Sequence, residues 1–195
     1  TSTSQHLVAR LNYPSRQVDG SIRTASASFD VTQDGTDVLV PDQGQGSVSL
    51  VDPSLVELSG STSVSQDVTV LQGANRVLGV DRTEGTVRGT TVSALSSLTS
   101  ARPLVEGQPG LVAAAGTDGS LHAVSVSAGT LTTVPVSGSG WGEPRTTSVT
   151  LPQGPSGDGA PQVPAHEVHT ADACQDAATL AVSLPDGHIA LPVFT

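Results

Sequence analysis

The chain has 195 residues, a formal net charge of −10 and only 2% aromatic residues. An acidic balance argues against nucleic acids and anionic membrane surfaces as ligands, because both require clustered cations that displace counterions. All eight basic residues are arginine and methionine is absent, so the core must be built from Val, Leu, Ile and Ala.

The sequence predicts short strands from one end to the other. Apolar runs alternate with Gly, Asp, Asn and Pro, which is typical of strands joined by tight turns. Residues 7–11 and 22–27 are expected to form two strands around the turn at Tyr13-Pro14-Ser15. The best candidate for a helix is the short segment Val92–Leu98.

One hairpin pattern recurs four times: an apolar strand, a turn containing glycine, and a more alternating strand. Glycine supplies the positive φ that such turns require. The turn glycines Gly46, Gly85, Gly119 and Gly187 are 39, 34 and 68 residues apart. This period is typical of β-propeller blades. We therefore predict a single all-β, β-propeller-like domain over residues 1–195, with about four degenerate blades, as a small ring or as part of a larger propeller.

Further strands are expected around the hairpins. Segments 28–31, 67–71, 103–105 and 167–169 each precede a hairpin and are predicted inner strands. An outer strand is predicted at 131–136, another strand at 146–151, and a surface loop at 154–164, where Pro and Gly disfavour regular structure. The N-terminal strands are free to pair into the last blade and close the ring. Without closure, exposed strand edges favour edge-to-edge dimers.

Three segments carry a family resemblance: residues 11–20 (LNYPSRQVDG), 28–35 (SFDVTQDG) and 48–53 (VSLVDP). They resemble the N-terminal extracytoplasmic region of large actinobacterial proteins that carry fibronectin type III domains. The resemblance implies propeller-like repeats and a secreted or cell-surface location. It brings no catalytic residues with it.

Targeting and redox signals are sparse. Cys174 is the only cysteine, so an intrachain disulfide is excluded. Neither a run of apolar residues long enough for a transmembrane helix nor a signal peptide is present. Because the chain also lacks an initiator Met, we expect a mature chain or a fragment of a longer multidomain protein.

Two groups of residues are candidate metal ligands. His166, His169 and Cys174 carry zinc-ligand chemistry, but His166 and His169 would point to opposite faces of one strand. The acidic residues Asp30, Asp34, Asp37, Asp42 and Asp52 carry calcium-ligand chemistry, without the spacing of a calcium loop. The alternative for the acidic group is that each Asp caps its own turn. We predict no metal or cofactor.

Catalytic patterns are equally weak. Ser, His and Asp occur, but a Gly-x-Ser-x-Gly element does not. Trp141, in a Gly-rich connector, is predicted to cover a hairpin rather than to anchor a ligand. We therefore predict a non-catalytic structural or interaction domain with a protein or glycan partner at the cell surface. A carbohydrate- or peptide-binding sensor, and a hydrolase or lyase on a propeller scaffold, are the alternatives.

Overall fold

The structure is a computed structural model that describes residues 1–108, 110–149, 182–183 and 189–190. Nearly all its regular structure is β-strand, as predicted. The strands of the first half are β1 (Leu7–Asn12), β2 (Gln17–Arg23), β3 (Thr32–Asp34), β4 (Asp37–Asp42), β5 (Ser47–Asp52), β6 (Glu57–Ser63), β7 (Val68–Gly73), β8 (Arg76–Asp81) and β9 (Thr86–Thr91). The later strands are β10 (Pro103–Val105), β11 (Val112–Ala115), β12 (Leu121–Ser125), β13 (Thr130–Val134), β14 (Val136–Ser137), β15 (Gly140–Trp141), β16 (Arg145–Ser148), β17 (Val182–Ser183) and β18 (Ile189–Ala190).

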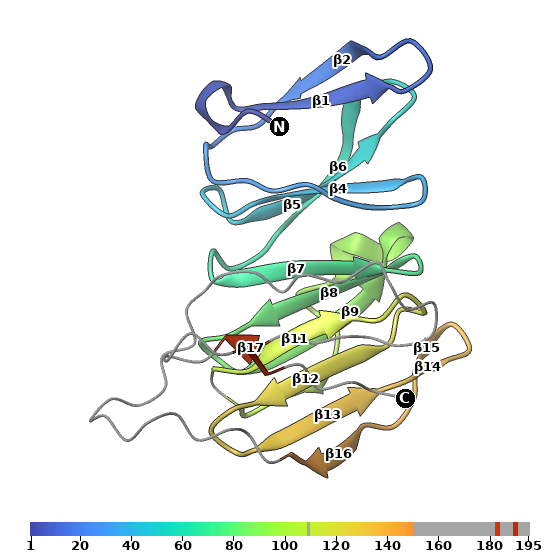
Figure 1. Cartoon of the computed structure of the whole chain (residues 1–195). Coiled ribbons are helices and arrows are strands. Elements are labelled where there is room, and N and C mark those ends of the chain that lie inside the picture. Colours follow the sequence, from blue (N-terminus) through green and yellow to red (C-terminus); the bar gives the residue numbers. More distant parts are fainter. Residues whose placement is uncertain (109, 150–181, 184–188, 191–195) are drawn as a thin grey trace. The chain divides into compact units, whose positions relative to one another are not determined.

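Three sheets contain four strands each (Figure 1). Their strand orders are β3-β4-β5-β6, β7-β8-β9-β10 and β11-β12-β13-β16. Within each of these sheets, the strands lie side by side in the order in which they occur in the chain. The hairpin β14–β15 is inserted in the connection between β13 and β16. The pairs β1–β2 and β17–β18 form two-stranded sheets. Two short 3-10 helices, η1 (Thr3–Gln5) and η2 (Val92–Ser97), accompany the strands, and η2 falls within the predicted helical segment.

Contacts between Cα atoms divide the chain into two compact units. The first comprises Thr1–Asp81 and Arg88–Arg102, and the second comprises Arg82–Val87 and Pro103–Thr195. The single domain over residues 1–195 stays a prediction.

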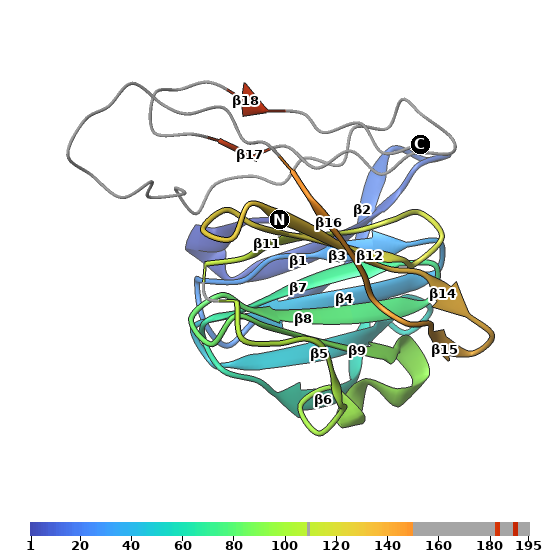
Figure 2. The same cartoon turned by 90° about the horizontal axis from the view of Figure 1, so that it is seen from below.

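In the first unit, the sheet β3–β6 carries a buried apolar layer on each face, because successive strand side chains point to opposite sides. Figure 2 shows the strands β1, β4 and β7 of this unit overlapping in the view from below. One layer joins the sheet to the β1–β2 hairpin and consists of Val8, Ile22, Phe29, Val40 and Val51. The other joins it to β7, β8 and the η2 region and consists of Leu39, Val48, Val70, Val77, Val92, Leu95 and Leu98. Burying one such side chain contributes about 1.5–3 kcal/mol.

The second unit has its own small apolar cluster, on one face of the sheet β11–β16. Val112 and Ala114 alternate along β11, and Val124 and Leu131 lie beside them on β12 and β13. All four are aliphatic, as the composition requires.

One turn geometry recurs through the chain. Four-residue loops join β4 to β5, β5 to β6 and β12 to β13. The last loop residue has a positive φ, which is 63° at Gly46, 56° at Val56 and 58° at Gly129. Such a φ costs glycine little, whereas for a β-branched residue such as Val56 it is a strained conformation.

The predicted alignment of the hairpin repeats is wrong at the third repeat. Gly119 lies between β11 and β12, the first two strands of a sheet, whereas Gly46 lies between the second and third. Gly85 precedes β9 in the same way as Gly46 precedes β5, and Gly129 is the matching residue before β13. The corrected spacings are therefore 39 and 44 residues. The error arose because both kinds of hairpin use glycine in their turns.

Several predicted strand positions also change. Segment 103–105 is β10, which lies at the opposite edge of its sheet from β7. It is therefore the fourth strand of this sheet and not the predicted inner, first strand. Because η2 is inserted between β9 and β10, β10 lies farther along the chain than a fourth strand that follows the third directly. Segment 131–136 is not an outer strand either, because β13 is the third strand and β16, within the predicted 146–151 region, forms the edge. Segment 28–31 lies just before the first strand of its sheet, β3, which begins at Thr32. The strand predicted at 67–71 is confirmed as β7. Gly187 and segments 154–164 and 167–169 lie outside the described residues.

Candidate functional site

The proposed zinc ligands His166, His169 and Cys174 lie outside the described residues. Within the part of the chain that the structure describes, no group of three or more His, Cys, Asp or Glu side chains is positioned to hold a metal ion. The same part contains no helix with the length and apolar character needed to cross a membrane.

Asp34, Asp42 and Asp52, three members of the acidic group, each accept hydrogen bonds from polar groups of the protein. Asp42, at the end of β4, accepts hydrogen bonds from the Ser26 hydroxyl, from the Ser26 backbone N–H at 3.1 Å and from Gln45 N–H at 3.0 Å. Burial alone would raise the pKa of Asp42, but these hydrogen bonds outweigh it and lower the pKa. Asp42 therefore connects the turn before β5 to the strand-free segment that follows β2.

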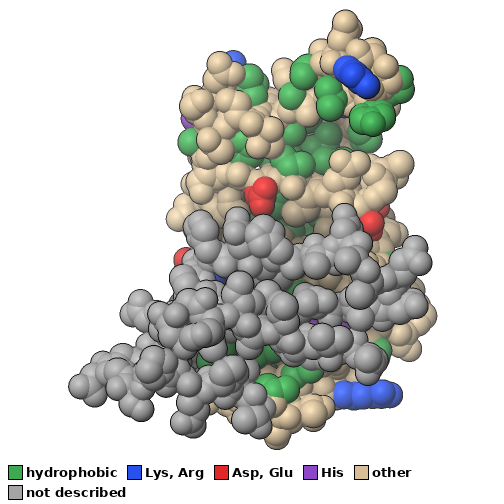
Figure 3. Space-filling view, in the orientation of Figure 1, with side chains coloured by type: hydrophobic (Ala, Val, Ile, Leu, Met, Phe, Trp, Pro, Cys, Tyr) green, Lys and Arg blue, Asp and Glu red, His purple; other side chains and the backbone are tan. Residues whose placement is uncertain are grey.

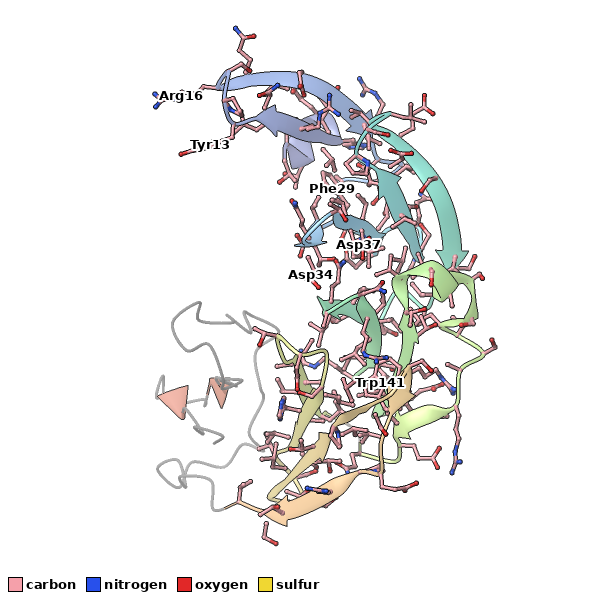
Figure 4. All side chains as sticks on the ribbon, turned by 90° about the vertical axis from the view of Figure 1, so that its right-hand side faces the viewer. Tyr13, Arg16, Phe29, Asp34, Asp37 and Trp141 are labelled. Atoms are coloured by element: carbon pink, nitrogen blue, oxygen red, sulfur yellow. The ribbon has the colours of Figure 1, made fainter. Side chains whose placement is uncertain are left out.

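Of two other members of the acidic group, Asp52 caps its own turn and Asp34 connects two different turns. Asp52 accepts hydrogen bonds from the Ser54 hydroxyl, from Ser54 N–H at 2.8 Å and from Leu55 N–H at 3.2 Å in the turn before β6, and these bonds, that of the hydroxyl most of all, lower its pKa. Asp34, which is labelled in Figure 4, accepts a bond from Asn75 N–H at 3.2 Å, and this bond joins the β3–β4 turn to the β7–β8 turn. The contacts of Asp52 are those of a residue that caps its own turn, which is the alternative to calcium binding, whereas the contact of Asp34 is not.

The second unit contains a polar cluster that the sequence analysis missed. It consists of Asp118, Ser120 and His122, at the turn between β11 and β12 and on β12 itself. Ser120 Oγ lies 3.0 Å from His122 Nε2, and Ser120 N–H donates to Asp118 Oδ1 at 2.9 Å. Thr133, on the neighbouring strand β13, has its Oγ1 3.4 Å from His122 Nδ1. The signal was the local pattern Asp-Gly-Ser-x-His in a glycine turn, which places alternate side chains on one face.

The electrostatics of this cluster follow from its burial. Burial lowers the pKa of His122, and the nearby Asp118 carboxylate opposes that shift only in part. For Asp118, burial would raise the pKa, but the hydrogen bonds from Ser120 lower it overall. At neutral pH, both shifts favour a neutral His122 imidazole beside an ionised Asp118 carboxylate.

The connectivity differs from that of a Ser-His-Asp hydrolase. In such a triad the carboxylate orients the imidazole and the serine is left facing the substrate. Here Ser120 lies between Asp118 and His122 and is itself buried. A Cβ on Gly116 would lie 2.5 Å from Ser120 Oγ, so the backbone closes over the hydroxyl. This arrangement braces a hairpin turn, and it leaves the serine no open side for a substrate.

Trp141 contacts the same turn from another hairpin. It is half-buried on β15, and its Nε1–H donates to the Gly119 carbonyl oxygen at 3.2 Å (Figure 4). A tryptophan held this way covers the β11–β12 turn, as the covering prediction expected.

In the described part of the chain, the exposed large hydrophobic side chains all belong to the first unit. They are Leu11, Tyr13, Val18, Leu55 and Leu58, with exposed fractions of 60%, 82%, 64%, 67% and 44%. Hydrophobic side chains are visible at the surface around β1 and β2 in Figure 3. Tyr13 and Leu55 occupy the turns of the hairpins β1–β2 and β5–β6, and Figure 4 shows Tyr13 and Arg16 extending from the first of them. The sequence analysis treated these turns only as connectors.

Comparison with known proteins gives a fold. A scan against models of protein families found no match, and a search of curated proteins found none either. Among solved structures, the chain is similar to the dihydro-heme d1 dehydrogenase NirN in complex with DHE, with a TM-score of 0.61 and 15% identity over 76% of this chain and 34% of that chain. It is also similar to streptogramin B lyase, with a TM-score of 0.55 and 10% identity over 98% of this chain and 63% of that chain.

A third similar structure is the WD40 domain from Toxoplasma gondii coronin, with a TM-score of 0.54 and 14% identity over 76% of this chain and 42% of that chain. The chain thus spans less than two thirds of each of these three proteins. Together with the sheets of four sequential strands, the similarities define the fold as β-propeller-like. At this level of identity they establish the fold alone.

Proposed function

We propose that the chain is a non-catalytic interaction module on a propeller-like scaffold, and that it binds a protein or peptide partner through the turns of β1–β2 and β5–β6. The observation that supports this most directly is the exposure of Tyr13 and Leu55, at 82% and 67%, in the turns of two hairpins that contact each other. The β5–β6 turn contacts the β1–β2 hairpin, because the Arg10 guanidinium, on β1, donates to the Pro53 carbonyl oxygen. Exposed aromatic side chains beside aliphatic ones are typical anchors of protein interfaces.

The setting we propose is a secreted or cell-surface bacterial protein of the actinobacterial type that carries fibronectin type III domains. Residues 11–20, 28–35 and 48–53 support it through their resemblance to such proteins. Fractionation of the source cells with a specific antiserum tests this location. We expect the protein in the medium or cell-wall fraction, and recovery with cytoplasmic proteins would contradict the proposal.

Binding is tested with peptide and glycan arrays probed by the wild-type chain, followed by titration of any ligand found. We expect a peptide ligand whose affinity falls at least tenfold in the Tyr13→Ala/Leu55→Ser variant. The matched control is Arg145→Ala, which removes an exposed side chain from β16 in the other unit and should leave affinity unchanged. Glycan binding in place of peptide binding would support the carbohydrate alternative instead. Substrate turnover that is lost in Ser120→Ala would overturn the non-catalytic proposal.

A further inference from the structure

The β1–β2 hairpin reproduces the β5–β6 hairpin at an offset of 40 residues. The pairing shifts register between Arg10 and Leu11 in the first hairpin, and between Leu50 and Val51 in the second. The loop of each hairpin ends in a non-glycine residue with positive φ, 54° at Arg16 and 56° at Val56. Because β5 and β6 are the third and fourth strands of a four-stranded sheet, β1 and β2 correspond to the third and fourth strands of a preceding blade.

The correspondence continues before β1. Ser2 N–H donates to the Leu7 carbonyl at 2.8 Å, and Leu7 N–H donates to the Ser2 carbonyl at 3.0 Å. Forty residues later, Asp42 at the end of β4 pairs with Ser47 at the start of β5. The residue before β1 is His6, with a φ of 55°, and Gly46 holds the matching position before β5. Ser2 therefore stands where the last residue of a second strand is expected.

The outer edge of β1 is otherwise open in the described part of the chain, where β1 belongs to a two-stranded sheet with β2. In an antiparallel ladder, alternate residues direct both backbone groups to the same edge. Since Leu7 bonds to Ser2 on the edge away from β2, Ala9 presents its N–H and C=O to that edge. The matching residue of β5, Ser49, pairs with Val40 of β4.

The side chains show a separate deficit, on a face of the sheet and not at the edge of β1. Val51 is 7% exposed because it packs in the cluster that contains Val8 and Ile22 of the preceding hairpin. Leu11, forty residues earlier, is 60% exposed, and Val18 is 64% exposed where its counterpart Leu58 is 44%. An apolar face that is covered in one copy of the repeat is therefore bare in the other.

We propose that the outer edge of β1 pairs with an antiparallel strand that ends at Ser2 and is formed by polypeptide N-terminal to Thr1, as the second strand of a hairpin like β3–β4. This inference concerns how the blade is completed and is independent of the proposed function. A second copy of the chain fits the edge poorly. Two β1 strands related by a two-fold axis at Ala9 would place Leu11 of one copy opposite Leu7 of the other, a position that Ser2 already fills.

The test adds the missing hairpin to the chain from its own sequence. Residues 28–40 are fused directly before Thr1, so that Val40 of the extension falls opposite Ala9 in the register of Val40 and Ser49. The matched control carries one additional glycine between the extension and Thr1, because a one-residue slip turns every side chain to the wrong face. Hydrogen exchange at the Ala9 amide and the urea midpoint of unfolding are measured for both variants and for the unextended chain.

We expect exchange at Ala9 to slow at least tenfold, with a higher urea midpoint, in the extended chain and not in the slipped control. Equal exchange in all three proteins would overturn the proposal. Protection of Ala9 in the unextended chain at every protein concentration would show that a segment within residues 1–195 fills the edge. Protection that appears only as concentration rises would assign the edge to a second copy.

Discussion

His122 lies on a strand whose other side chains are Leu121, Ala123, Val124 and Ser125, all of them buried. A histidine in such a strand must either be neutral or be compensated by a carboxylate. Asp118 supplies part of that compensation, but burial dominates and lowers the pKa of His122. The sequence shows that these residues are present, but it does not show their burial, since no local pattern tells that both faces of β12 are covered.

This pKa shift predicts the pH dependence of stability. Because the pKa of His122 in the folded chain is below its ordinary value of 6.5, the unfolded chain binds the proton more strongly as the pH falls below that value. We expect the urea midpoint to fall between pH 7.5 and pH 5.5. His122→Gln should flatten this dependence, and Asp118 should contribute only at lower pH, because its pKa is lowered from 3.8. An equal slope in the wild type and the variant would assign the dependence to another group.

Hairpins are the elements from which this chain is built, and their turns are specified locally. The side chain of the residue before the loop accepts a bond from a loop N–H, as in Asp42 with Gln45 at 3.0 Å and Ser125 with Ala128 at 3.3 Å. Glycine at the positive-φ position made some of these turns recognisable in the sequence. The hairpins that use Arg16 and Val56 at this position were harder to align with the repeat, because neither residue favours that conformation.

The exposed turn at Arg16 offers a direct test of this strain. We expect Arg16→Gly to stabilise the chain by about 1 kcal/mol, the order of the cost of a left-handed conformation for a residue with a Cβ. Arg16→Ala is the matched control, because it removes the same charge and keeps the Cβ, and it should leave stability nearly unchanged. Urea unfolding of the three proteins checks the prediction, and stabilisation by both variants would indicate that charge, not backbone strain, is responsible.

At the scale of the whole molecule, the core is aliphatic and distributed among separate layers. Phe29 is the one aromatic residue in the buried clusters of the described chain, and the remaining members are Val, Leu, Ile and Ala. Composition predicted this correctly. It also predicted short strands, because β-branched residues separated by glycine and aspartate suit a pleated sheet with tight turns.

The layered core predicts which leucines matter. We expect Leu39→Ala, at a side chain with no exposed surface, to lower the free energy of unfolding by about 2–5 kcal/mol. Leu55→Ala removes the same atoms from a side chain that is 67% exposed, and it should change stability by less than about 0.5 kcal/mol. Comparable losses in the two variants, measured by urea unfolding, would contradict the assigned core.

The sequence by itself determined the all-β class, the hairpins, most turns and an approximate blade period, because these depend on residues close together in the chain. Tertiary structure alone decided the order of strands in each sheet, including the place of β10 at an edge and the match of Gly129 to Gly46 and Gly85. It also decided exposure. Leu11 and Val51 hold the same place in two copies of one hairpin, yet only Val51 is buried, because a neighbouring hairpin covers it. Burial depends on the neighbours that the fold brings together, and no local pattern records them.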